Sequence, residues 1–157
     1  PAASAAGAPD AAPLRLARRR YDVGVSSDAV TVQIGTSNYR ATVRAGRHEW
    51  IADEPGSLGG ADAGPGPYAM LLAALGACKV MTGRMYADRK GWAVRSISCA
   101  LRHAREAGHE RIDVDVEIEG DLTDEQRERV ATIIGRCPLH RTLTGDLRIE
   151  SRLCVTP

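Results

Sequence analysis

Cysteines are the side chains of this sequence best suited to covalent chemistry, and the chain has four of them. Cys78 lies in an apolar stretch typical of a buried helix, and Cys137 directly precedes Pro138. A thiolate is a strong nucleophile, and two neighbouring thiols can interconvert with a disulfide. Proline disfavours helical backbone at the residue before it, so we expect Cys137 to end a helix. If the turn after it is helical, Cys137 is the N-cap of that turn.

The electrostatic surroundings of these two thiols are expected to differ. Free N–H groups at a helix N-terminus favour a thiolate, so an N-cap position predicts a lowered pKa for Cys137. His140 and Arg141 lie one turn further on and could add positive charge. Lys79 follows Cys78 directly, but adjacent helical residues point about 100° apart, so little help is expected from it. A structural role stays open for both cysteines, because buried thiols commonly pack as small hydrophobes and are inert.

Other kinds of site find little support in the sequence. Cys99 falls on the inward side of an expected strand and Cys154 lies near the C-terminus, and neither is assigned a function. The histidines are scattered, and no C-x-x-C or H-x-x-x-H spacing occurs, so no metal site is expected. Glycines between residues 56 and 66 match no phosphate-binding motif, and we expect no cofactor. Asp53 and Glu54 are adjacent acids for which a solvated turn is the better interpretation.

The composition indicates a single domain with a modest core. The chain has 157 residues, of which 43% are hydrophobic and 26% charged, and it contains no Phe. A core built from Ala, Val, Leu and Ile is small for this length, so burial of further surface between two copies is expected to help. We expect residues 1–19 to be a disordered tail and residues 20–157 to form one domain.

Charge and hydropathy argue against several partners. Acidic and basic residues are interspersed with a net charge of +1, and the basic cluster at 18–20 is too short to indicate nucleic-acid binding. The longest apolar run, residues 68–78, falls short of the ~20 residues that cross a bilayer. The sequence begins with no signal-peptide pattern, and a domain of this size does not need disulfides. We therefore expect a cytoplasmic protein with reduced thiols.

The first half of the sequence predicts an antiparallel meander followed by a long helix. Alternating hydrophobicity and turn residues predict strands at 20–25, 30–34, 39–44 and 48–52. A glycine-rich loop over 53–66 leads to Pro67, which suits the first position of a helix that Gly91 ends. The first half of this helix has no polar face, so we expect it to be buried on all sides.

The second half predicts two strands, a helix and a last strand. Strands are expected at 94–103 and 111–119, the latter with alternating apolar and acidic residues. Thr123 and Gln126 match a capping box that starts a helix ending near Cys137. The final strand is expected to place apolar residues on one face: Leu147, Ile149, Leu153 and Val155. Hairpins segregated from two helices indicate the α+β class.

Two stretches of this sequence resemble the OsmC/Ohr family. Residues 52–78 read ADEPGSLGGADAGPGPYAMLLAALGAC, and residues 81–92 continue the resemblance with MTGRMYADRKGW. Residues 119–143 read EGDLTDEQRERVATIIGRCPLHRTL, and with the leading meander the resemblance covers about residues 28–155. A central-helix cysteine combined with a second cysteine in a C-P-x-H-R-T-L context is a specific pairing.

The resemblance implies a fold, an assembly and an activity. It implies strongly curved antiparallel sheets around two central helices, in an intertwined homodimer with active sites at the interface. Characterised members of the family are thiol peroxidases that act on organic hydroperoxides. By residue matching, Cys78 would be the peroxidatic cysteine and Cys137 the resolving one. The two would form a disulfide that a dithiol, of the lipoyl type in this family, reduces again.

This sequence departs from the family pattern around the first cysteine. Tyr68 stands ten residues before Cys78, where the hydroperoxide-resistance branch has Glu. The activating arginine of the family comes from the first hairpin, where Arg40, Arg44 and Arg47 are the candidates. The pocket or activating candidates are therefore Tyr68, His140, Arg141, Arg40 and Arg47. Two alternatives stay open: a dimer that binds an apolar ligand at Tyr68 and the apolar helix, and a thiol-redox sensor without turnover.

Overall fold

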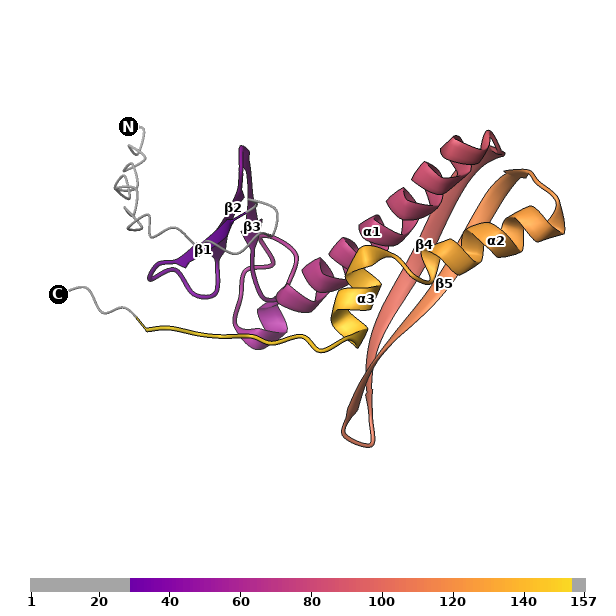
Figure 1. The fold of residues 1–157 in the computed structure, drawn as a ribbon. Coiled ribbons are helices and arrows are strands. Elements are labelled where there is room, and N and C mark those ends of the chain that lie inside the picture. Colours follow the sequence, from indigo (N-terminus) through magenta and orange to yellow (C-terminus); the bar gives the residue numbers. More distant parts are fainter. Residues whose placement is uncertain (1–28, 154–157) are drawn as a thin grey trace.

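The computed structural model describes residues 29–153 of the chain (Figure 1). The expected tail at 1–19, the expected strand at 20–25, Cys154 and Val155 lie outside the described residues. The elements in order are β1 (Val30–Ile34), β2 (Ala41–Ala45), β3 (His48–Ala52), a short 3₁₀ helix (Gly56–Leu58), α1 (Pro67–Lys90), β4 (Ala93–Glu106), β5 (His109–Asp121), α2 (Asp124–Ile134) and α3 (Pro138–Thr144).

The strands form two separate antiparallel sheets, which confirms the α+β class. β1, β2 and β3 pair in chain order, with Val43 of β2 opposite Val32 on one side and Trp50 on the other. β4 and β5 form a long hairpin in which Ile97 lies opposite Ile118. The structure adds a third helix, α3, to the two that the sequence predicted firmly.

The ends of α1 and α2 follow from local sequence. Pro67 is the first residue of α1, where its missing N–H is not needed, and Gly91 ends the helix in the left-handed region at φ 66°. The capping box of α2 is confirmed: the Gln126 N–H donates to Thr123 Oγ1, and the Thr123 N–H donates to Gln126 Oε1. These local signals fix where each helix begins and ends.

The expectation that α1 is buried on all sides is wrong for this chain. Its buried residues form one stripe at three- to four-residue spacing: Leu75, Gly76, Lys79, Gly83 and Ala87. On another side, the side chains of Met81 and Met85 are 62% and 61% exposed. The cause is that β4, α2 and α3 cover only the stripe, and beyond it the Trp50 indole of β3 reaches Met70 near the start of the helix (3.3 Å), which leaves Met81 and Met85 uncovered by the described residues.

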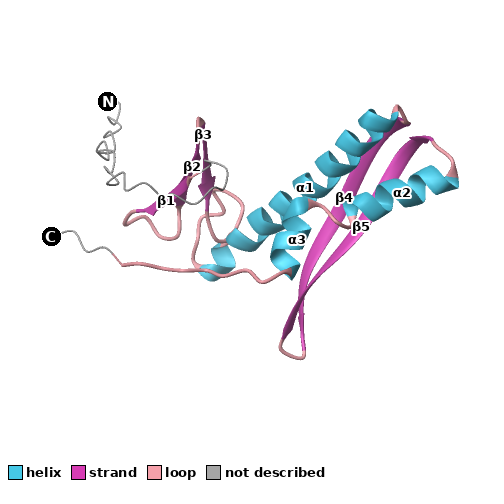
Figure 2. Cartoon of the chain, in the orientation of Figure 1, coloured by secondary structure: helices cyan, strands magenta, loops and turns pink. Residues whose placement is uncertain are grey.

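α1 packs against β4 of the β4–β5 hairpin and against α2 (Figure 2). At Gly83, an added Cβ would lie 2.8 Å from Ile134 Cδ1 of α2 and 3.0 Å from Ile97 Cδ1 of β4. The Arg84 guanidinium donates to Val94 O (2.6 Å), which ties α1 to the start of β4. Arg127 of α2 donates in the same way to Ile118 O (2.7 Å) near the end of β5. These contacts hold the two helices in register with the hairpin.

The loop between β3 and α1 is organised by a buried carboxylate. Asp53 is 3% exposed and accepts backbone N–H groups from Glu54 (2.9 Å), Ala61 (3.1 Å) and Ala63 (3.1 Å). These N–H groups, that of Ala63 above all, hold the pKa of Asp53 below its usual value of 3.8 against the opposing effect of desolvation. The expectation that Asp53 belongs to a solvated turn is therefore wrong.

Two expected apolar strand faces have no cover within the described residues. Val30, Val32 and Ile34 of β1 are exposed, so this strand is not half-buried as its alternation predicted. The last expected strand is not formed: residues 146–153 are extended but pair with neither sheet (Figure 1), and Leu147, Ile149 and Leu153 are exposed. A strand needs a neighbour for its backbone N–H and C=O groups, and residues 29–153 supply none there.

Candidate active site

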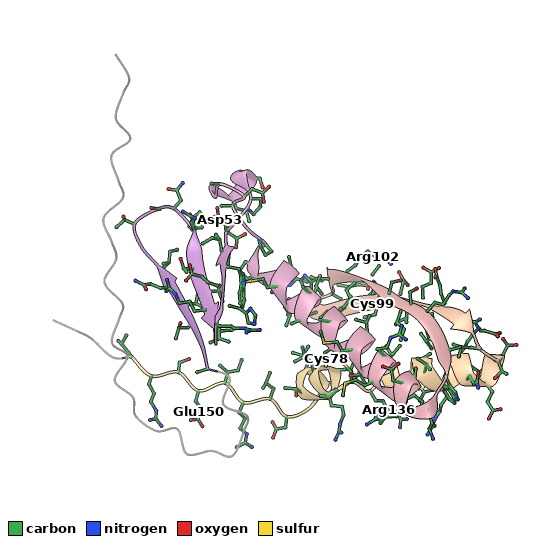
Figure 3. All side chains as sticks on the ribbon, turned by 90° about the horizontal axis from the view of Figure 1, so that it is seen from above. Asp53, Cys78, Cys99, Arg102, Arg136 and Glu150 are labelled. Carbon is green, nitrogen blue, oxygen red and sulfur yellow. The ribbon has the colours of Figure 1, made fainter. Side chains whose placement is uncertain are left out.

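The two cysteines predicted to work together meet at the first turn of α3. Cys78 lies on α1 and is half-buried, whereas Cys137 is the N-cap of α3 and is 0% exposed. The Leu139 N–H donates to Cys78 Sγ (3.4 Å), and the His140 N–H donates to Cys137 Sγ (3.4 Å). Two consecutive backbone N–H groups of one turn thus donate to the two sulfurs. Figure 3 shows Cys78 on the side of α1 that faces α3.

The sequence between α2 and α3 explains this geometry. α2 ends at Ile134, and the chain turns so that the Cys137 N–H donates back to Ile134 O (3.3 Å). Pro138, as the first residue of α3, has no N–H, so the first N–H groups available at this helix end belong to Leu139 and His140. Both point at sulfur atoms. The conditional expectation that Cys137 caps a helical turn is confirmed.

The expected direction of the Cys137 pKa is wrong. Burial raises the pKa of the Cys137 thiol above its usual value of 9.0, and this effect outweighs the His140 N–H that lowers it. The neighbouring Cys78 side chain, as hydrogen-bond partner and as charge, raises the pKa further, while the charge of Lys79 lowers it. The sequence argument counted the N–H donors but not the complete removal of the sulfur from water.

Lys79 is the site residue whose place the sequence reasoning missed. It is 4% exposed, and its Nζ donates to Ile134 O (3.4 Å), the carbonyl that also accepts the Cys137 N–H. Lys79 therefore lies against the α2–α3 turn, where its charge acts on Cys137. The sequence held half of the signal: Lys79 is four residues from both Leu75 and Gly83 and so shares a face of the helix with them, but the spacing does not show that this face is the buried one.

The remaining site candidates are placed differently. The Tyr68 ring stacks on His103 of β4, with centroids 4.4 Å apart, and ten residues of helix put Tyr68 about 15 Å along α1 from Cys78. Arg40 contributes a favourable charge to Asp53, and Arg47 is exposed in the turn between β2 and β3. Arg141 is exposed on α3. Within residues 29–153, no hydrogen bond or ion pair joins these four side chains to either thiol.

A groove lies on a different side of α1 from the thiol pair. It has a volume of about 450 Å³ and runs between α1 and β4, where Ala73, Ala77 and Leu101 give it an apolar wall. Cys99 lines the groove and donates its S–H to Gly76 O (3.7 Å). Cys78 and Cys137 are not part of its lining.

Among residues 29–153 there is no cluster of three or more His, Cys, Asp or Glu side chains that could hold a metal ion. None of the helices described is long and apolar enough to cross a membrane.

Comparison with solved structures shows the same fold in bacterial proteins. The OsmC-like protein of Mycoplasma pneumoniae is 22% identical, with a TM-score of 0.65 over 77% of this chain and 89% of that one. The organic hydroperoxide resistance protein OsmC of Legionella pneumophila is 16% identical, with a TM-score of 0.59 over 79% and 93%. The organic hydroperoxide resistance protein OhrB of Bacillus subtilis is 17% identical, with a TM-score of 0.55 over 77% and 93%.

Comparison of the sequence with curated proteins gave no match. The family profile described as OsmC-like protein, in contrast, matches residues 59–152. This range contains both cysteines of the pair, the whole of α1 and the turn that links α2 to α3. The resemblance found in the sequence is thereby confirmed, and the chain belongs to the OsmC-like protein family.

Proposed function

We propose that this protein is a thiol peroxidase that reduces organic hydroperoxides with Cys78 and Cys137. The observation that carries the proposal is the meeting of the two sulfurs at one turn of α3, where each accepts a backbone N–H. Two of its structural neighbours are named organic hydroperoxide resistance proteins, which supports the substrate class. The expected site residues other than the cysteines are kept as candidates that a partner copy would bring close.

The proposed cycle balances with one hydroperoxide and one dithiol. The Cys78 thiolate attacks the peroxide O–O bond, which yields an alcohol and a Cys78 sulfenic acid. Cys137 then attacks the Cys78 sulfur, and its proton leaves with the sulfenic hydroxyl as water while the disulfide forms. A dithiol of the lipoyl type reduces this disulfide by exchange and is itself oxidised to a cyclic disulfide. The Leu139 N–H donates to Cys78 Sγ, the sulfur that starts the cycle.

We further propose that the working form is a homodimer. The apolar residues left uncovered on α1, β1 and the extended C-terminal segment are the surfaces that a second copy would bury. In such a dimer the hairpin that carries Arg40 and Arg47 in one copy would lie near Cys78 of the other. That arrangement would supply an activating arginine, which neither thiol contacts within residues 29–153 of one copy.

Oxidation of the purified protein tests the proposal. Excess organic hydroperoxide should consume the Cys78 and Cys137 thiols and form one disulfide between them, found by peptide mapping. The Cys78→Ser variant should consume no peroxide, while Cys137→Ser should consume one equivalent and retain a sulfenic acid. Cys99→Ser, a matched change at a thiol outside the pair, should behave as the unmodified protein. If Cys78 and Cys137 still titrate as free thiols after oxidant treatment, the peroxidase proposal is wrong.

The apolar groove supports a second candidate, a ligand-binding or redox-sensing dimer without turnover. Its volume of about 450 Å³ falls within the range of small-molecule sites, and its lining is mostly aliphatic. A ligand binder should bind apolar ligands equally well in the Cys78→Ser variant. A sensor should oxidise once and stay oxidised when a dithiol and fresh peroxide are supplied together, whereas a peroxidase turns over repeatedly.

A further inference from the structure

Lys79 is a buried cation with few partners. Of the residues that the structure describes, two with charged side chains are buried, Asp53 and Lys79. Asp53 accepts three backbone N–H groups, whereas the Lys79 Nζ has one acceptor, Ile134 O at 3.4 Å. Burial of a lysine is rare because the ammonium loses its hydration, so a buried lysine needs a compensating interaction. The reason for a cation at this position of an apolar helix must therefore lie in the groups around its ammonium.

The position of Lys79 relative to Cys137 gives such a reason. Ile134 O accepts both the Lys79 ammonium and the Cys137 N–H, so one carbonyl links the lysine to the backbone of the cysteine. Ile134 is also the last residue of α2, and the free carbonyls at a helix C-terminus favour a nearby cation. The last carbonyl of α2, the helix that precedes Cys137, therefore holds the charge of Lys79 near this cysteine.

We propose that Lys79 is a positioning residue for Cys137, which fixes the turn before this cysteine and stabilises negative charge on its sulfur in the resolving step. The step rests on the proposed peroxidase function: Cys137 attacks Cys78 sulfenic acid, the S–O bond breaks, and water leaves with the Cys137 proton. The sulfur that attacks must carry thiolate character at the moment when the S–S bond forms. A cation fixed nearby stabilises that charge without being consumed.

The charges that face Cys137 come from three elements. From α1, Cys78 opposes ionisation of Cys137 and Lys79 favours it. From α3, His140 offers its backbone N–H, and Arg141 is exposed. From the turn that follows α2, Arg136 is exposed as well. Lys79 is thus the buried charged side chain that offsets the burial of this sulfur, which raises the pKa of the Cys137 thiol.

A titration of Cys137 alone tests this role without peroxide. In a protein with Cys78, Cys99 and Cys154 changed to Ser, the ultraviolet absorbance of the Cys137 thiolate is followed against pH. Lys79→Met should raise the titration midpoint by about one unit, which lowers the thiolate fraction at neutral pH about tenfold. Lys79→Arg should keep the original midpoint. Lys90→Met, the same change at the exposed end of α1, should leave it unmoved.

The resolving step gives a second readout. In a protein that keeps all four cysteines, Lys79→Met should prolong the lifetime of the Cys78 sulfenic acid about tenfold, measured by dimedone capture. The rate at which this sulfenic acid forms should not change. If no sulfenic acid forms in any variant, the peroxidase function fails, while the titration still decides the role of Lys79. Equal midpoints in the Lys79→Met and unsubstituted proteins would overturn the inference. Lys79→Gln, which retains a donor to Ile134 O but no charge, supplies the same test if the Met variant does not fold.

Discussion

At the scale of single residues, Cys137 is held between opposing effects, and burial prevails. In the proposed peroxidase cycle a neutral Cys137 beside Cys78 is an advantage, because two thiolates in contact would repel each other and suppress the nucleophile that attacks the peroxide. Burial and the Cys78 side chain raise the pKa of Cys137, while the His140 N–H and the charge of Lys79 lower it. This arrangement suits the order of the proposed cycle, in which Cys78 attacks first and Cys137 second.

The raised pKa of Cys137 predicts a loss of stability at alkaline pH. The folded pKa lies above the usual value of 9.0, so the folded state holds the proton more tightly than the unfolded state. This contribution to stability is complete below 9.0 and disappears as pH rises through the folded pKa. The free energy of unfolding, measured with denaturant on either side of this range, should fall less steeply in Cys137→Ser than in the unmodified protein. Cys99→Ser serves as the control, and a Cys137→Ser profile parallel to it would contradict the prediction.

At the scale of elements, local signals in the sequence determined where helices begin and end but not what covers them. Pro67, Gly91 and the Thr123–Gln126 box act within a few residues, so their effect is readable without a fold. The burial of Lys79 and Asp53 depends on Ile134 and Ala63, which the chain brings in from a distance. Periodicity placed Lys79 on a helix, but only the packing of α1 against α2 shows that its stripe is the buried one.

The contact of α1 with α2 and β4 predicts opposite outcomes for two glycines of α1. Replacing a helix-interior glycine by alanine favours the helix by about 1 kcal/mol. In Gly83→Ala the new methyl meets Ile134 and Ile97 from two sides at 3.0 Å or less, and such overpacking costs about 1–3 kcal/mol. In Gly76→Ala it meets the mobile end of Leu101 at 2.9 Å, which can shift. Thermal unfolding should show Gly83→Ala destabilised and Gly76→Ala unchanged or stabilised; the reverse order would contradict this account of the packing.

At the scale of the whole molecule, the exposed apolar surface explains why burial was overestimated from the sequence. Eight apolar residues are buried among those described, which is a small core, while large side chains on α1, β1 and the C-terminal segment face solvent. Hydrophobic patterning records that a face is covered, but it does not say whether the cover comes from the same chain. The expected all-round burial of α1 and the expected last strand are both absent from residues 29–153 for the same physical reason: no described element covers these apolar faces.

The exposed methionines of α1 give the test of the proposed dimer. Met81 and Met85 lie one turn apart and are 62% and 61% exposed, so a second copy that covers α1 would bury both. Burial of one methionine contributes about 1.5–3 kcal/mol, and a two-fold interface counts each substitution twice. Met81→Glu should therefore weaken dimerisation by at least about 100-fold, measured by sedimentation equilibrium over a range of concentrations. Ala131→Glu, the same added charge on the exposed polar side of α2, should leave the association unchanged. Equal association in both variants would mean that α1 is not the interface, and a monomeric unmodified protein would remove the dimer altogether.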